Sequence, residues 1–406
     1  MNFPNSLRAL NSRNYRLFFS GQSLSLIGNW MTITTTAWLG YELSNSAFVL
    51  GLLGFASQIP TLLLSPFTGL LGDRFERRRL LVMLAALAML QSLTLAVITH
   101  TGVVTVGWLL ALAVVQGLIN SVEFPTRQSF VIEMIDDRKD LPNAIGLNSS
   151  MFNLARLLGP SLAGLALVNL GAAACYAIDT FTYLPVIGCL LAMRPRPRPA
   201  RSGPVPAPLA LLRAGWGYAI RTPSVRAPLI LVSTIAMFGF AGNMLAPVFA
   251  RDVFHGDAGT LGWMFASVGG GALVAALVLS NLPSVRQLAR WITRGGLFIA
   301  AGLIGLGLSP NLPCALASLA VTGLGTVFAM AGSNTLIQSF VEDDKRGRIM
   351  GLFVMAVSMG PVGSALVGYA AEHAAGPRWT VLGCSLLVIA AALRFRHVMK
   401  TRPTVA

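Results

Sequence analysis

Three ionisable side chains lie within long apolar stretches of the sequence, at Glu123, Arg156 and Asp179. A charged group among apolar residues is costly, so residues of this kind usually belong to a pathway or a binding site. The guanidinium of Arg156 suits a carboxylate, phenolate or phosphate group. A carboxylate in apolar surroundings favours its protonated form, so Asp179 and Glu123 are candidates for carrying a proton. The sequence therefore offers one candidate for anion binding and two for proton transfer.

Each of these residues also has a purely structural interpretation. Arg156 and Asp179 stand on consecutive apolar segments and would neutralise each other if their side chains met. Glu123 is followed by Arg127 one helical turn later, which is the spacing of an ordinary i,i+4 ion pair. At the level of the sequence both interpretations stay open.

A polar stripe accompanies Arg156. If residues 142–168 form a helix, then Ser149, Asn153 and Arg156 share one face of it. Arg156 then lies roughly 22 Å along the helix, near the middle of a bilayer. Such a face suits the wall of a cavity, and amides on other apolar segments would serve a cavity or helix–helix hydrogen bonds equally well. With this stripe, the candidate substrate-binding residues are Arg156, Asn153, Ser149, Asn29, Gln22, Asn243 and Asn334.

The elements that would position these residues are membrane-spanning helices. Of the 406 residues, 54% are hydrophobic and only 11% are charged, unlike the composition of a soluble domain. A helix needs roughly 20 apolar residues to cross a bilayer, and backbone groups in lipid must bond within a helix or a closed barrel. Residues 80–95 and 272–282 are apolar on nearly every side, which excludes the alternating strands of a barrel. The sequence therefore predicts an all-α membrane protein.

The apolar stretches fall into two sets of six. This predicts twelve transmembrane helices in two six-helix bundles, at residues 1–193 and 226–406, joined by a Pro-rich basic linker at 194–225. The tetrapeptide at 128–131, Gln-Ser-Phe-Val, recurs at 338–341, which supports two related halves. The expected spans are 15–41, 47–72, 79–99, 105–126, 142–168, 172–193, 227–250, 259–282, 291–309, 313–338, 348–371 and 379–395.

The net charge of +15 is concentrated in alternate loops. All of the 30 Lys and Arg residues except Arg156, Arg251 and Arg378 lie in, or within a few residues of, the termini, the linker or the even-numbered loops. Loops on the cytoplasmic side of a membrane carry the excess of Lys and Arg. We therefore expect both termini and the linker to be cytoplasmic, and we take the charge as a sign of orientation, not of nucleic-acid binding.

A glycine and charge motif follows the second expected span, and it reads Gly69-Leu-Leu-Gly-Asp-Arg-Phe-Glu-Arg-Arg-Arg79. The positive-inside rule explains its arginines but not the spacing of the glycine and the aspartate. The motif resembles the loop signature of the major facilitator superfamily, G-x-x-x-D-R-x-x-R-R. The resemblance implies a conformational latch on the cytoplasmic side that holds the outward-open state, made by Gly69, Asp73, Arg74 and Arg77.

A longer resemblance covers most of the N-terminal half. It includes Phe124-Pro-Thr-Arg-Gln-Ser-Phe-Val at 124–131 and Asn153-Leu-Ala-Arg-Leu-Leu-Gly-Pro at 153–160. These segments resemble the enterobactin-exporter and macrolide-efflux branch of the same superfamily. The resemblance implies secondary active export of a siderophore or an amphipathic drug-like compound, by alternating access and proton antiport, in the inner membrane of a bacterium. Its partners would be this small molecule, protons and membrane lipids, with the chain as a monomer.

Two positions depart from that branch. Asn29 stands where an acid is often found, and an arginine that drug antiporters often carry upstream of Gln116 is missing, so proton coupling is implied by the resemblance alone. The alternatives are a facilitator of uptake or lipid movement, and a receptor or scaffold that does not transport.

The sequence contains no Walker loop, no H-E-x-x-H and no G-x-S-x-G motif, and its four His residues are scattered. We therefore expect no enzyme activity, no catalytic residue, no cofactor, no metal and no nucleic-acid partner.

Overall fold

The computed structural model is helical over nearly all the residues it describes, which are 4–74, 76–194, 217–279, 285–341, 343–374 and 376–401. Within these ranges, the side chains of residues 5–6, 65–74, 138, 285–286 and 343–348 are not described. Every regular element in this part of the chain is a helix, so the predicted all-α class is confirmed.

The chain forms two compact units. The first contains Met1–Leu43 and Ile59–Pro204, and the second contains Ser44–Gln58 and Val205–Ala406. Helix α2 (Ala47–Arg74) therefore contributes its first turns to the second unit and the rest to the first. The predicted linker at 194–225 falls largely on residues 195–216, which lie outside the described part of the chain.

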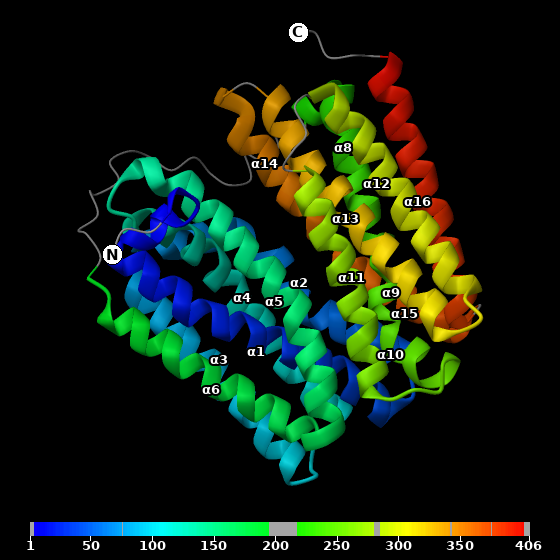
Figure 1. Cartoon of the computed structure of the whole chain (residues 1–406), viewed down its shortest axis with the longest axis horizontal. Coiled ribbons are helices and arrows are strands. Elements are labelled where there is room, and N and C mark those ends of the chain that lie inside the picture. The colour runs from blue at the N-terminus through cyan, green and yellow to red at the C-terminus, as the bar shows by residue number, and fades with distance from the viewer. Residues whose placement is uncertain are drawn as a thin grey trace. The chain divides into compact units, whose positions relative to one another are not determined.

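The first unit is built mainly from helices that precede residue 193. Gly171 ends one of them with a φ of 80°, a left-handed conformation that glycine adopts without strain, so the next helix starts at once. In this unit α3 and α6 run side by side (Figure 1). Its elements, besides α2, are η1 (Asn5–Asn11), α1 (Arg13–Ser44), α3 (Arg77–His100), α4 (Val106–Met134), η2 (Arg138–Asp140), α5 (Leu141–Leu170) and α6 (Ala172–Ala192).

The second unit contains two spans that are interrupted. The span expected at 227–250 includes two π-helical turns, and Pro247, which has no N–H to donate to the helical ladder, lies between them. The span expected at 348–371 breaks at residues 358–359, just before Pro361. The elements are α8 (Pro223–Thr234), η3 (Ile235–Gly239), α9 (Ala241–Met244), α10 (Ala246–Val248), η4 (Phe249–Val253), α11 (Ala258–Leu279), α12 (Val285–Leu308), α13 (Leu312–Phe340), α14 (Asp343–Val357), α15 (Gly360–His373) and α16 (Gly376–Thr401).

Helix α13 packs closely against α11 and α12 through glycines. A Cβ atom added at Gly323 of α13 would collide with the carbonyl of Val268 on α11. An added Cβ at Gly295 of α12 would lie 2.7 Å from the backbone nitrogen of Ala329 on α13. Small residues let helix backbones approach closely where burial from water supplies no driving force. The interior of the second unit is therefore packed backbone against backbone.

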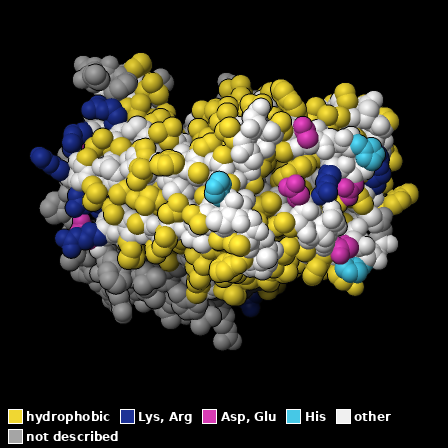
Figure 2. Space-filling model, turned by 90° about the horizontal axis from the view of Figure 1, so that it is seen from below, with side chains coloured by type: hydrophobic (Ala, Val, Ile, Leu, Met, Phe, Trp, Pro, Cys, Tyr) yellow, Lys and Arg dark blue, Asp and Glu magenta, His cyan; other side chains and the backbone are white. Residues whose placement is uncertain are grey.

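The outward sides of the helices are apolar. Eleven helical segments of the described chain are long and apolar enough to cross a membrane, and α1, with 32 residues, has the length to be a twelfth. Leu165, Phe181 and Leu386 are 63%, 68% and 65% exposed, and Figure 2 shows hydrophobic side chains over most of the face that it presents. So much exposed apolar surface is suited to lipid. The chain is a multi-pass membrane protein.

Candidate functional site

A cleft of about 270 Å³ opens on the first unit between α1, α4 and α5. Its wall is amphipathic, because both aromatic rings and polar side chains line it. Ligand-binding clefts typically combine an apolar wall with a few polar groups that orient the ligand. The rings are those of Phe18, Phe124 and Phe152, and the polar residues are Arg127, Gln128, Asn148, Ser149 and Asn153.

The predicted polar stripe of α5 forms part of this wall. Ser149 and Asn153 line the cleft, with Asn153 Nδ2 donating to the carbonyl of Ser149 at 2.8 Å. Arg156 lies one turn further along and is half-buried. Its guanidinium carbon is 5.9 Å from the centre of the Trp30 ring, and Phe152 of the cleft meets the same ring edge-on. The stripe thus continues from the cleft into an aromatic contact with α1.

Asp179 is buried in a cluster of hydroxyl groups. Its Oδ2 accepts hydrogen bonds from Thr32 Oγ1 at 2.8 Å and from Ser92 Oγ at 2.9 Å, and Thr182 Oγ1 lies 3.4 Å from Oδ1. The carboxylate is only 1% exposed. These hydroxyls, rather than the guanidinium of Arg156, are the partners of Asp179, and they tie α6 to α1 and α3.

Gly28 lets α1 approach this cluster. A Cβ atom added at Gly28 would lie 2.5 Å from Asp179 Oδ1 and 2.6 Å from Thr182 Oγ1. Both separations are too short for real contacts, so a side chain here would push α1 away from α6. The hydroxyl cluster is therefore enclosed by direct backbone contact.

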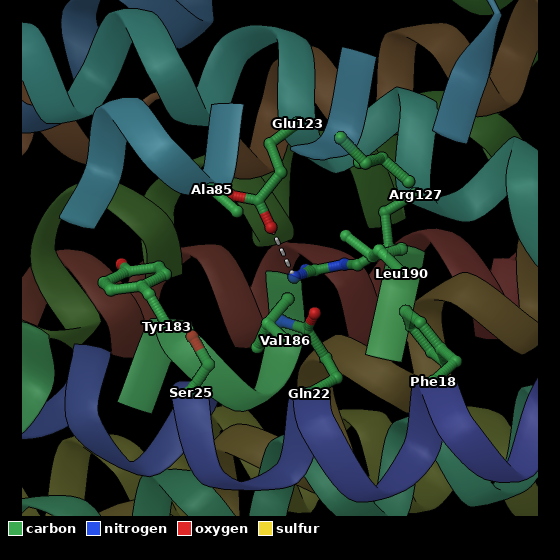
Figure 3. Close-up of a pocket in the computed structure, with 10 residues that line it drawn as sticks. Phe18, Gln22, Ser25, Ala85, Glu123, Arg127, Tyr183, Val186 and Leu190 are labelled. Atoms are coloured by element: carbon green, nitrogen blue, oxygen red, sulfur yellow. Dashed lines mark hydrogen bonds and ion pairs between the residues drawn. The ribbon is translucent and has the colours of Figure 1, made fainter. Parts of the chain in front are cut away.

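Glu123 forms the predicted i,i+4 ion pair with Arg127, with 2.9 Å between Glu123 Oε1 and Arg127 Nη1. The pair borders a second cavity of about 20 Å³, enough for about one water molecule. Figure 3 shows the two side chains of the pair pointing toward each other, with Gln22 and Ser25 reaching up from α1 and Tyr183 from α6. This carboxylate therefore lies next to space for water.

Residues 5–404 match the family described as transmembrane secretion effector. The chain belongs to this family, a branch of the major facilitator superfamily. It is 24% identical to the staphyloferrin A transporter of Staphylococcus aureus, covering 94% of this chain and 95% of that protein. It is 26% identical to the multidrug efflux pump Tap of Mycolicibacterium fortuitum, covering 88% and 89%. The solved structure of nucleoside transporter NupG has the same fold, with a TM-score of 0.70, 13% identity and coverage of 95% of this chain and 99% of that chain.

Membership of this family confirms the predicted superfamily and its export branch. The protein is a membrane transporter for a small molecule, and it is not an enzyme.

The remaining predicted substrate-binding residues are amides, and they lie in both units of this transporter. Gln22 is buried beside the small cavity, and Asn29 is hydrogen-bonded to the Tyr183 side chain. In the second unit, Asn334 Oδ1 accepts a hydrogen bond from Gln338 Nε2 at 2.5 Å, and Asn243 is half-buried on α9, between the two π-helical turns. The structure thus brings Gln22 close to Glu123 and leaves the roles of the second-unit amides as predictions.

The superfamily latch is described only at Arg77. Arg77 Nη1 lies 2.7 Å from Glu133 Oε1 and donates to the carbonyl of Ser129 at 3.0 Å, which joins α3 to α4. The surroundings of Gly69 and the side chains of Asp73 and Arg74 are outside what the structure describes, so the pairing of Asp73 with Arg77 stays a prediction.

The sequence did not predict Arg127 and Asn148 as residues of the cleft. From the sequence, Arg127 is interpreted as a charge of a cytoplasmic loop, because the fourth span is expected to end at residue 126. Helix α4 instead continues to Met134 and carries Arg127 along the wall. The i,i+4 spacing of Glu123 and Arg127 is the signal that this helix continues.

Proposed function

We propose that this transporter exports an amphipathic small molecule, of siderophore or drug-like type, by alternating access and antiport against inward-moving protons. The observation that carries the proposal is the cleft of about 270 Å³ on the first unit, whose wall is both aromatic and polar. The names of two relatives, a staphyloferrin A transporter and a multidrug efflux pump, support this substrate range, and the name of the second also supports export.

The same proposal includes the arrangement of the chain in a bacterial inner membrane, as a monomer with both termini in the cytoplasm. Residues 1–193 and 226–406 are the two bundles that move relative to each other, and 194–225 is their cytoplasmic linker. Gly69, Asp73, Arg74 and Arg77 form the latch on that side, which the resemblance of the motif supports.

The wall of the cleft supports the proposed substrate chemistry. Phe124 and Phe152 offer ring faces, while Asn148, Ser149 and Asn153 offer hydrogen bonds. A volume of about 270 Å³ is at the lower end for a ligand site. The cleft therefore holds part of a drug-sized molecule, and Asn243 and Asn334 remain proposed substrate-binding residues of the second unit.

Asp179 and Glu123 are the two groups proposed to bind protons during transport. Asp179 is held by hydroxyls that can either donate to a carboxylate or accept from a carboxylic acid, so the cluster accommodates both protonation states. Glu123 is beside space for water, through which a proton can arrive.

A matched pair of substitutions on α5 tests whether the cleft carries substrate. Asn153 and Asn169 both donate from Nδ2 to the carbonyl four residues earlier, but only Asn153 is among the residues that line the cleft. In proteoliposomes with a pH gradient, we expect Asn153→Leu to lower transport of a fluorescent drug about tenfold, as expected for loss of one polar contact. Asn169→Leu should transport normally. Equal rates in the two variants would place the substrate elsewhere.

A further inference from the structure

Of the two residues in the Glu123–Arg127 ion pair, only Arg127 is among the residues that line both the cleft and the water-sized cavity. Its side chain lines the cleft of about 270 Å³ and the water-sized cavity, whereas Glu123 lines only the smaller one. The guanidinium carbon of Arg127 is 5.7 Å from the centre of the Phe124 ring, which itself faces the cleft. The guanidinium of Arg127 therefore lies beside an aromatic wall of the cleft, and Glu123 is among the residues of the smaller cavity only.

We infer that Arg127 binds the anionic group of an aromatic substrate in the cleft, and that Glu123, released from its partner, takes up one proton from the water-sized cavity. The inference rests on the proposed function in one respect, because it takes the cleft as the substrate site. It adds Arg127 as a residue that determines substrate specificity, and Glu123 as the group that binds the proton.

An aromatic anion fits the surroundings of Arg127. A guanidinium presents a planar set of donors that a carboxylate or phosphate accepts in pairs. Next to it, Phe124 and Phe152 supply rings for stacking, and Asn148 supplies a further hydrogen bond. A substrate with an acidic group on an aromatic ring uses all three.

Proton uptake is expected because the Glu123 carboxylate loses its cation when the substrate binds. When the anion takes Arg127, the Glu123 carboxylate faces a mostly apolar wall without a cation, and a proton from water removes this unfavourable charge by forming an O–H bond on Glu123. The charge of the site is then the same empty and loaded, because the anion replaces the carboxylate. The polar and titratable residues that line this cavity with Glu123 are Gln22 and Ser25 of α1, Arg127 of α4 and Tyr183 of α6, and the rest of the lining is apolar.

This arrangement separates the roles of the two candidate proton carriers. Anion and proton bind together at the pair, so each raises the affinity for the other. Antiport requires the opposite, since its proton must leave before the substrate binds. Exchange of substrate against protons therefore falls to Asp179, and Glu123 balances the charge of the substrate.

The test uses purified full-length protein in detergent with two probes of the same shape, 2-naphthoate and its neutral amide, 2-naphthamide. Equilibrium dialysis measures binding of each probe, and a pH-indicator dye in weak buffer measures protons taken up. For the wild type we expect about one proton per bound naphthoate, none for naphthamide, and a naphthoate affinity that rises by up to about tenfold per pH unit as the pH falls.

Four variants separate the contributions. Arg127→Gln should lose at least about tenfold in naphthoate affinity, the effect of one charged contact, and should still bind naphthamide, which also shows that it is folded. Glu123→Gln should bind naphthoate at least as tightly as the wild type with no proton uptake and no pH dependence. The double variant E123Q/R127Q keeps the pair neutral as a second check on folding. Arg8→Gln breaks an exposed pair with Asp140 and should behave as wild type.

Each failure has a distinct meaning. If wild type binds neither probe, the cleft is not the substrate site, and the proposed function and this inference both fail there. If wild type binds both probes and Arg127→Gln binds naphthoate as tightly, only the role of Arg127 is overturned. Proton uptake that persists in Glu123→Gln would overturn the role of Glu123.

Discussion

Asp179 and Glu123, two carboxylates of the first unit, are held in opposite ways. Asp179 accepts hydrogen bonds from hydroxyls on α1 and α3, so three helices meet at it. Glu123 is paired with a cation on its own helix and lies beside a cavity for water. The first arrangement resists change because helices must separate to open it, whereas the second opens by a side-chain rotation. We call Asp179 with its hydroxyl partners the fixed centre, and the Glu123–Arg127 pair the exchangeable centre.

The largest effect on stability is expected where the fixed centre is removed. Asp179→Leu removes the acceptor of the buried Thr32 hydroxyl, at about 1–3 kcal/mol for an unsatisfied group, whereas the Ser92 hydroxyl keeps the carbonyl of Tyr176 as an acceptor at 3.1 Å. We expect a lower thermal unfolding midpoint in detergent and an inactive protein. Asp179→Asn keeps an acceptor oxygen and should unfold near the wild-type temperature. Equal midpoints for the Leu and wild-type proteins would show that the cluster does not hold the helices together.

A smaller loss is expected from crowding the same centre. Gly28→Ala places a methyl group against Asp179 and Thr182, and overpacking of this kind costs about 1–3 kcal/mol. Gly188 on α6 is the control, because an added Cβ there meets nothing within 4 Å, so Gly188→Ala should be neutral or slightly stabilising. Comparing the thermal unfolding midpoints of the two variants shows whether α1 packs tightly against α6 at Gly28. Similar midpoints would argue against the tight contact.

At the exchangeable centre, the effect should depend on which partner is removed. Arg127→Gln leaves the Glu123 carboxylate in a mostly apolar wall without its cation, and we expect a loss of about 1–2 kcal/mol in the free energy of unfolding, discounted for partial exposure. The double variant E123Q/R127Q leaves no unpaired charge and should stay close to wild type. An equal loss in the double variant would show that the unpaired carboxylate is not the cause.

The smallest effect is expected at the exposed pair of Arg8 and Asp140, whose side chains are 43% and 21% exposed. Surface pairs contribute about 0–1 kcal/mol and are screened by salt. Arg8→Gln should therefore shift the unfolding midpoint little, and not at all in high salt. A large shift would mean that ion pairs in general, and not the two centres, stabilise the first unit.

Much of the helical architecture could be predicted from apolar stretches, because lipid requires long helices. The polar stripe of Ser149 and Asn153 was also predictable, since its residues share one helix. The partners of Asp179 were not, because they come from α1 and α3, and hydroxyls of Thr and Ser occur on every helix. The π-helical turns near Pro247 likewise depend on packing that no local pattern encodes.

The most direct test of coupled export is transport by proteoliposomes under an imposed pH gradient, comparing wild type with Asp179→Asn. We expect that the gradient drives movement of a fluorescent drug by the wild type and that Asp179→Asn, although folded, abolishes this gradient-driven movement. Transport by the wild type that is unchanged by the gradient and by this substitution would contradict proton antiport through Asp179.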